Sequence, residues 1–364
     1  MNQYNKVMEN RQKLVDKILD NLDKGYVLTP PLWNKGITRP FNPISSAVYR
    51  GGNAISLYVA ALENGYDDNR WMTFKQAQSK GYKIQKGAKG VFCEKWIFDK
   101  LVTKTDELTG ETIQVREKLD KPIANYFYVY NASQIDGIEP LIQTELSPSD
   151  TLSIADDLIM SSECPVFEMK SESRAYYSPT KDEIHLPSRH LFKDDISFLD
   201  VAVHEMGHST GHETRMNRDL KNSFGSKEYA IEELRAEFAS YFVGADLNVN
   251  LNNEHLQDHT NYISSWKEVL KDEPKVLYKA INDADLISQH LIKNYNKCID
   301  LKKSLNSAEL PSATIDRLTK QINDNQIKNI IKSADITPHH KQMLNVMLEQ
   351  KKDALTTPNL SVTR

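Results

Sequence analysis

A chain of 364 residues is longer than one hydrophobic core usually supports, so two domains and an appendage are expected. The sequence has no run of about 18 apolar residues and no signal-peptide pattern at its polar N-terminus, which argues against a membrane protein and against secretion. Its three cysteines are far apart, which excludes a disulfide framework and a cysteine-based zinc site and makes a reducing cytoplasm the expected location.

Charge is spread unevenly along the chain. The net charge is −4, but residues 1–135 hold 20 basic against 14 acidic side chains, or +6, which leaves −10 for the remainder. Between residues 70 and 100, eight basic side chains stand against two acidic ones. A basic stretch of this density suggests a polyanion as partner, although a charge run is more often a solvated face.

Residues 1–137 read as a small α+β domain. Residues 5–24 have the apolar spacing of an amphipathic helix, a second helix is expected after its cap at Asn53, and a short third helix after its cap at Thr73. Strands are expected at Tyr82–Ile84, Val91–Phe98, the two arms of an exposed hairpin at 101–121, and Asn125–Tyr130. The first two of these strands are expected to pair through a turn at Gly87–Gly90.

Residues 138–150 are the expected linker, because the composition shifts there and two prolines occur. Residues 151–295 read as a second, mainly helical domain, in which two short strands surround a turn at Pro179–Asp182. Beyond residue 296 polar residues dominate, which predicts a polar helical extension over 296–364 with a disordered tail from about Thr356.

The most informative stretch is His204-Glu205-Met206-Gly207-His208, with two histidines four residues apart. On a helix this spacing places both imidazoles on one face, where they can share a Zn²⁺ ion or another divalent ion such as Mn²⁺. Glu205 then lies beside the metal, placed to take a proton from a bound water as the catalytic base. The helix is apolar almost all round and is expected to be buried.

Three protein ligands and one open position make a catalytic zinc site, so a third ligand is needed. Glu233 is the candidate, on an expected helix at Lys227–Asp246 that Ser226 caps. It shares one face of that helix with Glu237. The pattern from Glu233 to Glu237 resembles the third-ligand helix of gluzincin metallopeptidases. That resemblance implies that Glu233 binds the metal and that Glu237 accepts a hydrogen bond from a ligating histidine.

The two halves together resemble the ArdC-type antirestriction proteins of plasmids and other mobile elements. The N-terminal half resembles the single-stranded DNA-binding domain of that family, which also occurs in plasmid primases, through residues 49–54, 71–77, 81–90 and 128–131. The C-terminal half resembles the zincin-like metallopeptidase domain of the family through residues 177–179, 182–187, 204–208, 212–216 and 232–237. The resemblance implies an α+β fold in which the DNA-binding domain precedes a mainly helical gluzincin-like domain with a short antiparallel sheet.

Binding a single strand without sequence preference requires cations along the phosphates and aromatic faces for the bases. Lysines and aromatic residues interleave between residues 71 and 96, which meets this requirement. The expected contacts to single-stranded DNA are Arg50, Asn53, Trp71, Lys75, Tyr82, Lys83, Lys86 and Lys89. The alternative for Phe74, Phe92 and Trp96 is that they form the core of a small sheet.

Three functions remain open. The first is an antirestriction protein of a mobile element that binds single-stranded DNA and carries a zinc metallopeptidase site. The second is a DNA-associated metalloprotease that cleaves proteins on single-stranded DNA, and the third is a DNA-binding protein with a purely structural metal. Glu205 is unnecessary in a structural site, which favours an enzyme. The protein or peptide substrate is not identified, and Tyr177, His212 and Tyr229 are all candidates to stabilise an oxyanion.

Overall fold

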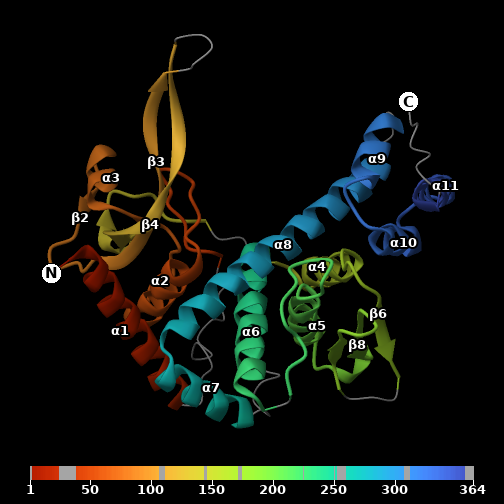
Figure 1. Ribbon diagram of the computed structural model, residues 1–364, viewed down its shortest axis with the longest axis horizontal. Coiled ribbons are helices and arrows are strands. Elements are labelled where there is room, and N and C mark those ends of the chain that lie inside the picture. Colours follow the sequence, from red (N-terminus) through yellow and green to blue (C-terminus); the bar gives the residue numbers. More distant parts are fainter. Residues whose placement is uncertain are drawn as a thin grey trace. The chain divides into compact units, whose positions relative to one another are not determined.

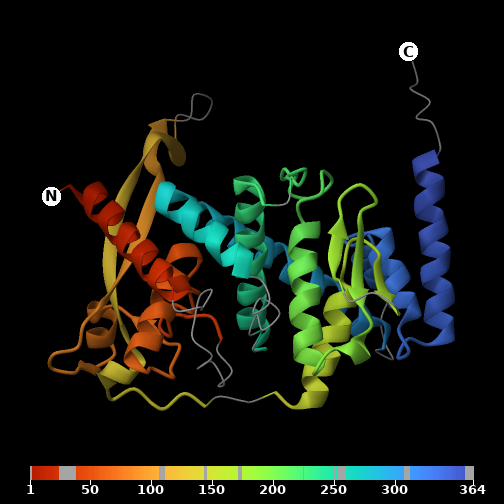
Figure 2. The same cartoon turned by 90° about the horizontal axis from the view of Figure 1, so that it is seen from below.

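The computed structural model describes residues 2–23, 38–105, 111–142, 146–170, 174–223, 225–249, 251, 260–306 and 312–356. The chain forms two compact units, drawn as ribbons in Figures 1 and 2. The chain contains both helices and small sheets, which confirms the expected α+β class. None of the helices in the described ranges has both the length and the apolar character needed to cross a bilayer.

Unit 1 consists of Met1–Thr144 and Asn261–Asn282, and unit 2 of Glu145–Thr260 and Asp283–Arg364. Unit 1 therefore includes α7 (Thr260–Asp272) from its second residue and the start of α8 (Lys275–Leu305), and the rest of α8 belongs to unit 2. The domains predicted from the composition, residues 1–137 and 151–295 with an extension at 296–364, stay a prediction.

The core of unit 1 is an antiparallel sheet with the strand order β1-β4-β3, namely Trp71–Met72, Thr112–Asn131 and Val91–Thr105. Because side chains alternate along a strand, the sheet has two faces. α2 (Gly51–Asn64) covers one face, where Leu57, Cys93 and Val129 are buried together. α1 (Gln3–Asp23) covers part of the other through Val7, which packs on Phe92.

The apolar stripe predicted for the first helix is confirmed. Every member of the stripe is buried, namely Val7, Leu14, Val15, Ile18 and Leu22. The cap predicted at Asn53 is wrong, because α2 begins at Gly51, after Arg50 as its N-cap. The side-chain amide of Asn53 instead bonds the backbone of β3, donating to Glu94 O and accepting from Glu94 N at 2.9 Å each.

The hairpin expected at 101–121 is not a separate element. β3 and β4 are continuous strands that pair from Val91↔Val129 to Thr105↔Thr112. Their register shifts between Ile97 and Asp99, a bulge that bends the pair. Beyond the bulge the hairpin projects past α1 and α2 (Figure 1), and Phe98 in it is 61% exposed. The residues that connect the two arms, 106–110, lie outside the described residues.

The strand at Lys83–Ile84, β2, does not pair with β3 through the Gly87–Gly90 turn as expected. It pairs antiparallel with β5 (Ile135–Asp136), which follows a short 3-10 helix, η1 (Ala132–Gln134). The prediction failed because two-residue strands leave no pattern that identifies their partner. The predicted cap at Thr73 is confirmed, since its hydroxyl accepts from the backbone of α3 (Phe74–Ser79) in a capping box.

Unit 2 contains a sheet with the order β6-β8-β7, namely Val166–Met169, Glu183–Pro187 and Tyr176–Ser178. The antiparallel pair predicted around Pro179–Asp182 is confirmed as β7 and β8. The parallel strand β6 was not predicted from the sequence, and it makes the sheet mixed rather than antiparallel. α4 (Pro148–Met160) packs on α5 (Asp195–Ser209), and the sheet packs on α5 through β7 and β8. A short 3-10 helix, η2 (Arg189–Leu191), precedes α5.

The C-terminal segment contains α9 (Ser312–Thr319), α10 (Asp324–Lys332) and α11 (Pro338–Thr356). Its apolar residues form one buried cluster with Met160 of α4. Four side-chain amides at the start of α10 and along it donate to the carbonyls at the end of α4, from Met160 to Glu163, at 2.7–3.2 Å: Asn323, Asn325, Gln326 and Asn329. The polar composition of this segment therefore has a structural use. The predicted tail lies almost wholly outside the described residues.

Candidate metal centre

α5 carries the H-E-x-x-H motif in the interior of unit 2. Asp194 caps it by accepting from the backbone N–H of Ser197 at 2.8 Å. Every residue from Phe198 to Gly207 is buried, as the apolar composition of the helix predicts. His204 and His208 lie one turn apart on the same face, with ring centroids 4.7 Å apart.

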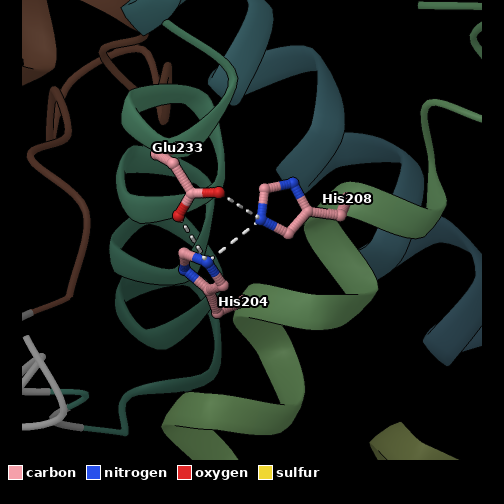
Figure 3. Close-up of side chains that lie close together, drawn as sticks. All are labelled: His204, His208 and Glu233. Carbon is pink, nitrogen blue, oxygen red and sulfur yellow. Dashed lines mark hydrogen bonds and ion pairs between the residues drawn. The ribbon is translucent and has the colours of Figure 1, made fainter. Parts of the chain in front are cut away.

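α6 (Lys227–Leu247) supplies the third side chain. Ser226 caps this helix as predicted, accepting from the backbone N–H of Tyr229. α5 and α6 pack closely at Gly207, where a Cβ would lie 3.5 Å from Cα of Ala236. This approach brings Glu233 against both histidines (Figure 3).

The three donor atoms have the spacing of metal ligands. The Nε2 atoms of the two histidines are 3.1 Å apart, and the Glu233 carboxylate has one oxygen 3.4 Å from His204 Nε2 and the other 3.4 Å from His208 Nε2. Ligands about 2.0–2.1 Å from a tetrahedral zinc are about 3.3 Å from each other. The donor set and its spacing therefore fit a divalent ion, with one coordination position left for substrate or water.

The electrostatics of the site favour positive charge where these atoms meet. Burial lowers the pKa of His204, but the carboxylates of Glu237 and Glu233 outweigh it and raise the pKa to about 9. Burial raises the pKa of Glu233, but the two histidines hold it far below its usual value, so Glu233 is a carboxylate. Glu237, which is fully buried, has an oxygen 2.9 Å from His204 Nδ1, an ion-pair contact on the ring nitrogen that faces away from Glu233.

Glu232 is a functional residue that the sequence interpretation missed. Its carboxylate lies 3.4 Å from Nδ1 of His208, so it faces His208 as Glu237 faces His204. Hydrogen bonds of this kind set the tautomer of a ligating histidine and leave Nε2 for the metal. A signal existed in the sequence, because an acid on a helix that is otherwise buried needs a partner.

Arg218 fixes Glu232 in place. Its guanidinium donates to both carboxylate oxygens of Glu232, at 2.7 and 3.2 Å, and to the hydroxyl of Thr210 at 2.8 Å and the carbonyl of Gly207 at 2.9 Å. Arg235 lies on the other side, with Nη1 3.2 Å from the same carboxylate. The segment after α5 is thereby tied to both ligand helices.

A second cluster connects that segment to the sheet. Arg215 donates to Asp182 with two nitrogens, one of them at 3.0 Å, and to the carbonyl of Ser209 at 2.7 Å. The hydroxyl of Tyr177 donates to Asp182 at 2.7 Å, so its proton is already engaged. Tyr177 is therefore a poor oxyanion donor, which leaves His212 and Tyr229. Tyr229 is one turn before Glu233 on the same face of α6.

Glu205, the predicted base, follows His204 directly on α5 and is 7% exposed. Its charge acts on His208, whose pKa it helps to raise against the effect of burial. A buried carboxylate at this position is screened little by solvent, so it acts strongly on a proton donor beside the ligand atoms.

The residues predicted to contact DNA divide into two groups. Five cations among them are exposed on unit 1: Arg50, Lys75, Lys83, Lys86 and Lys89. Tyr82 is partly buried and packs on the cluster of Met72, Ala77 and Ile135.

Two of the predicted contacts are contradicted by their surroundings. Trp71 is 1% exposed in the core beside Leu57 and Cys93, so its ring offers no face to a base. The amide of Asn53 is used by the backbone of β3, as described above. Exposure separates a stacking ring from a core ring, and the sequence pattern does not carry that information.

Comparison with known proteins identifies both halves of the chain. Residues 8–130 match the N-terminal domain of the anti-restriction factor ArdC, and residues 154–283 match the zincin-like metallopeptidases. The metal-free crystal structure of the antirestriction protein ArdC from plasmid R388 superposes with a TM-score of 0.60 at 29% identity, covering 79% of this chain and 97% of that one. The chain belongs to the ArdC antirestriction family. The resemblance inferred from the sequence is thereby confirmed, and the zincin-like fold implies a divalent metal.

Other relatives extend this result. A second structure of R388 ArdC, with Mn(II) bound, matches with the same TM-score over 78% of this chain. Two DNA primases TraC of Escherichia coli are 32% and 33% identical over 85% and 77% of this chain. The chain spans only 30% and 19% of these primases. Protein y4eC of Sinorhizobium fredii is 32% identical over 69% of this chain and 80% of its own length.

Proposed function

We propose that this ArdC-family protein is an antirestriction protein of a mobile element, which binds single-stranded DNA through unit 1 and hydrolyses peptide bonds at the metal centre of unit 2. One observation carries the enzymatic part: His204, His208 and Glu233 converge at ligand spacing beside the buried Glu205. The DNA-binding part is supported by the match of residues 8–130 to the ArdC N-terminal domain and by the exposed lysines there.

Zinc is the ion we propose, held by Nε2 of both histidines and by the Glu233 carboxylate. Two imidazoles and one carboxylate with an open fourth position are typical of catalytic zinc. Manganese is the alternative, since a Mn(II)-bound structure of R388 ArdC exists and its donor preferences overlap. When bound, such an ion polarises a carbonyl and lowers the pKa of water.

The side chains of this protein do the remaining work. Glu205 takes a proton from the attacking water and returns it to the leaving amine. Glu237 and Glu232 orient His204 and His208 through their Nδ1 atoms. His212 or Tyr229 donates a hydrogen bond to the developing oxyanion.

A second candidate function is a protease that acts on proteins bound to single-stranded DNA, and protection against restriction then depends on hydrolysis. The buried Glu205 favours it over a structural metal, because shielding DNA needs no base. The two candidates differ only in whether hydrolysis is required for protection.

The experiment compares wild type with Glu205→Gln, which keeps the size of the side chain and removes the base. Glu213→Gln is the matched control, because Glu213 is an exposed acid shortly after α5. We expect Glu205→Gln to abolish turnover of an unfolded protein substrate, with metal content and affinity for single-stranded DNA unchanged. Turnover retained in Glu205→Gln would refute the assigned base, and no turnover in wild type with metal and DNA would favour a structural ion.

Protection of plasmid DNA from restriction is then measured in cells with the same variants. Protection that survives Glu205→Gln supports shielding by DNA binding alone. Protection lost together with turnover supports the protease.

A further inference from the structure

One face of the unit 1 sheet carries a strip of aromatic rings. Phe92 lies opposite Tyr128, and Tyr126 is two residues before Tyr128, so all three share a face. The rings of Phe92 and Tyr126 are stacked with centroids 5.0 Å apart, and Tyr128 meets both edge-on at 5.8 and 6.0 Å. α1 covers Phe92 to 9% exposure, but Tyr128 remains 41% exposed.

A second exposed ring, Phe74, comes from the element that follows β1. β1 pairs Met72 with Tyr130, which shares this face of β4 with Tyr128, and the chain turns into a helix after Thr73. Phe74 is the first residue of α3, which packs on β4, and its ring is 55% exposed. Phe74 and Tyr128 are thus exposed aromatic residues on two elements that pack on each other.

The backbone at Gly90 lies very close to Tyr128 and Tyr130. A Cβ on Gly90 would lie 3.1 Å from Cβ of Tyr128 and 3.0 Å from the ring of Tyr130. Only glycine lets this segment lie so near the strip without a shift of the rings. Lys89, which precedes Gly90, is therefore held beside the strip with its side chain exposed.

Cations border the strip on its described sides. Lys6 of α1 donates to the hydroxyl of Tyr126 at 3.4 Å and lies 4.7 Å from the centroid of that ring. Lys75 follows Phe74 directly and is exposed. From Trp71 to Cys93 the sequence has five lysines and no acidic residue.

We propose that Phe74 and Tyr128 are stacking platforms for two bases of a single strand, and that Lys6, Lys75 and Lys89 hold its phosphates. The inference deepens the DNA binding proposed above and rests on it. A single strand fits because its bases have free faces, whereas a duplex hides them inside the stack. The positive border fits the phosphates of a nucleic acid, whereas a neutral protein surface would use only the rings.

The test measures the affinity of the full-length protein for a fluorescent oligothymidine by anisotropy, at several salt concentrations. Phe74→Ala and Tyr128→Ala are each expected to weaken binding about 5- to 150-fold, with little change in salt dependence. Tyr128→Phe keeps the ring and is expected to bind like wild type. Lys75→Ala with Lys89→Ala is expected to flatten the slope of log affinity against log salt by about 1.4.

Phe98→Ala is the matched control. Phe98 is 61% exposed on the projecting hairpin, away from the strip. Its removal therefore tests whether the loss of an exposed ring outside the strip also weakens DNA binding. Equal effects of Phe98→Ala and Phe74→Ala, or no effect of Phe74→Ala and Tyr128→Ala, overturn the strip while DNA binding itself stands. Wild type that binds single strands no better than duplex overturns both the strip and the DNA-binding function. Circular dichroism of each variant establishes that the fold is retained.

Discussion

Removing Arg218 tests how the metal centre is held together. Arg218 and Glu232 form a buried pair whose side chains are 11% and 6% exposed, and Arg218 makes three further hydrogen bonds, to Thr210, Gly207 and the sulfur of Met216. Breaking a buried ion pair by removing one partner costs about 3–5 kcal/mol, because the other charge is left uncompensated. Arg235 still faces Glu232 in the variant, so we expect Arg218→Ala to lower the free energy of unfolding by about 3 kcal/mol.

The measurement is urea unfolding of the chelator-treated protein, followed by circular dichroism. Lys320→Ala is the control in the same unit, because Lys320 pairs with Asp316 at the surface with 69% of its side chain exposed. Such a pair contributes about 0.5 kcal/mol or less.

A double-mutant cycle isolates the pair itself. Glu232→Gln removes the charge that Arg218→Ala leaves behind, so the double variant is expected to lose less stability than the two single losses together. We expect a coupling of about 1–3 kcal/mol, as found for residues that share one ion-pair network. Additive losses, or an Arg218→Ala effect no larger than that of Lys320→Ala, would show that the buried pair is not what holds the site.

Three further predictions concern packing, thiols and pH. A Cβ at Gly207 meets Ala236 at an ordinary contact distance, but one at Gly244 would lie 2.7 Å from a carbonyl oxygen. We therefore expect Gly244→Ala to lower the melting temperature and Gly207→Ala to leave it unchanged or raise it, and the reverse order contradicts the packing described. Burial raises the pKa of all three cysteine thiols, Cys93, Cys164 and Cys298. The native protein should therefore not react with a thiol reagent at about pH 8, whereas the denatured protein should show three reactive thiols. A fast reaction of the native protein would contradict this. Burial raises the pKa of Asp182, but hydrogen bonds from Arg215 and Tyr177 lower it overall, so its stabilising effect is present above the unfolded value of 3.8 and is lost as pH falls below it. The difference between the urea midpoints of wild type and Asp182→Asn should therefore shrink as pH falls from the unfolded value of 3.8 through the lower folded-state pKa, and a constant difference would contradict this.

The features predicted well from the sequence are those that depend on local spacing. Two histidines four residues apart share a helix face wherever the helix forms, and Glu233 and Glu237 obey the same rule on α6. The caps at Ser226 and Thr73 are local as well, because the hydroxyl bonds a backbone N–H two or three residues away. Such interactions can be derived without knowing which elements meet.

The features that were missed depend on contacts between distant residues. Glu232 is recognisable as the partner of His208 only once α5 and α6 are packed. The same holds for β2, which pairs with a strand about 50 residues later instead of its neighbour. Trp71 and Phe74 are three residues apart and equally aromatic, yet one is core and the other surface, since the chain turns from β1 into α3 between them.

The amides of α10 at the end of α4 decide where the protein can be divided. A chain cut after residue 295 would leave the four carbonyls at the end of α4 without their donors. It would also expose the apolar cluster around Met160, the last residue of α4, and α4 packs on α5. Each carbonyl that stays buried without a donor costs about 1–3 kcal/mol. Lys351 extends the dependence further, since its ammonium donates to the carbonyls of Thr319, the last residue of α9, and of Ile322 in the segment after it. The smallest autonomous folding piece that keeps the metal centre thus reaches into α11, and a fragment drawn to the limits of the peptidase homology is expected to aggregate.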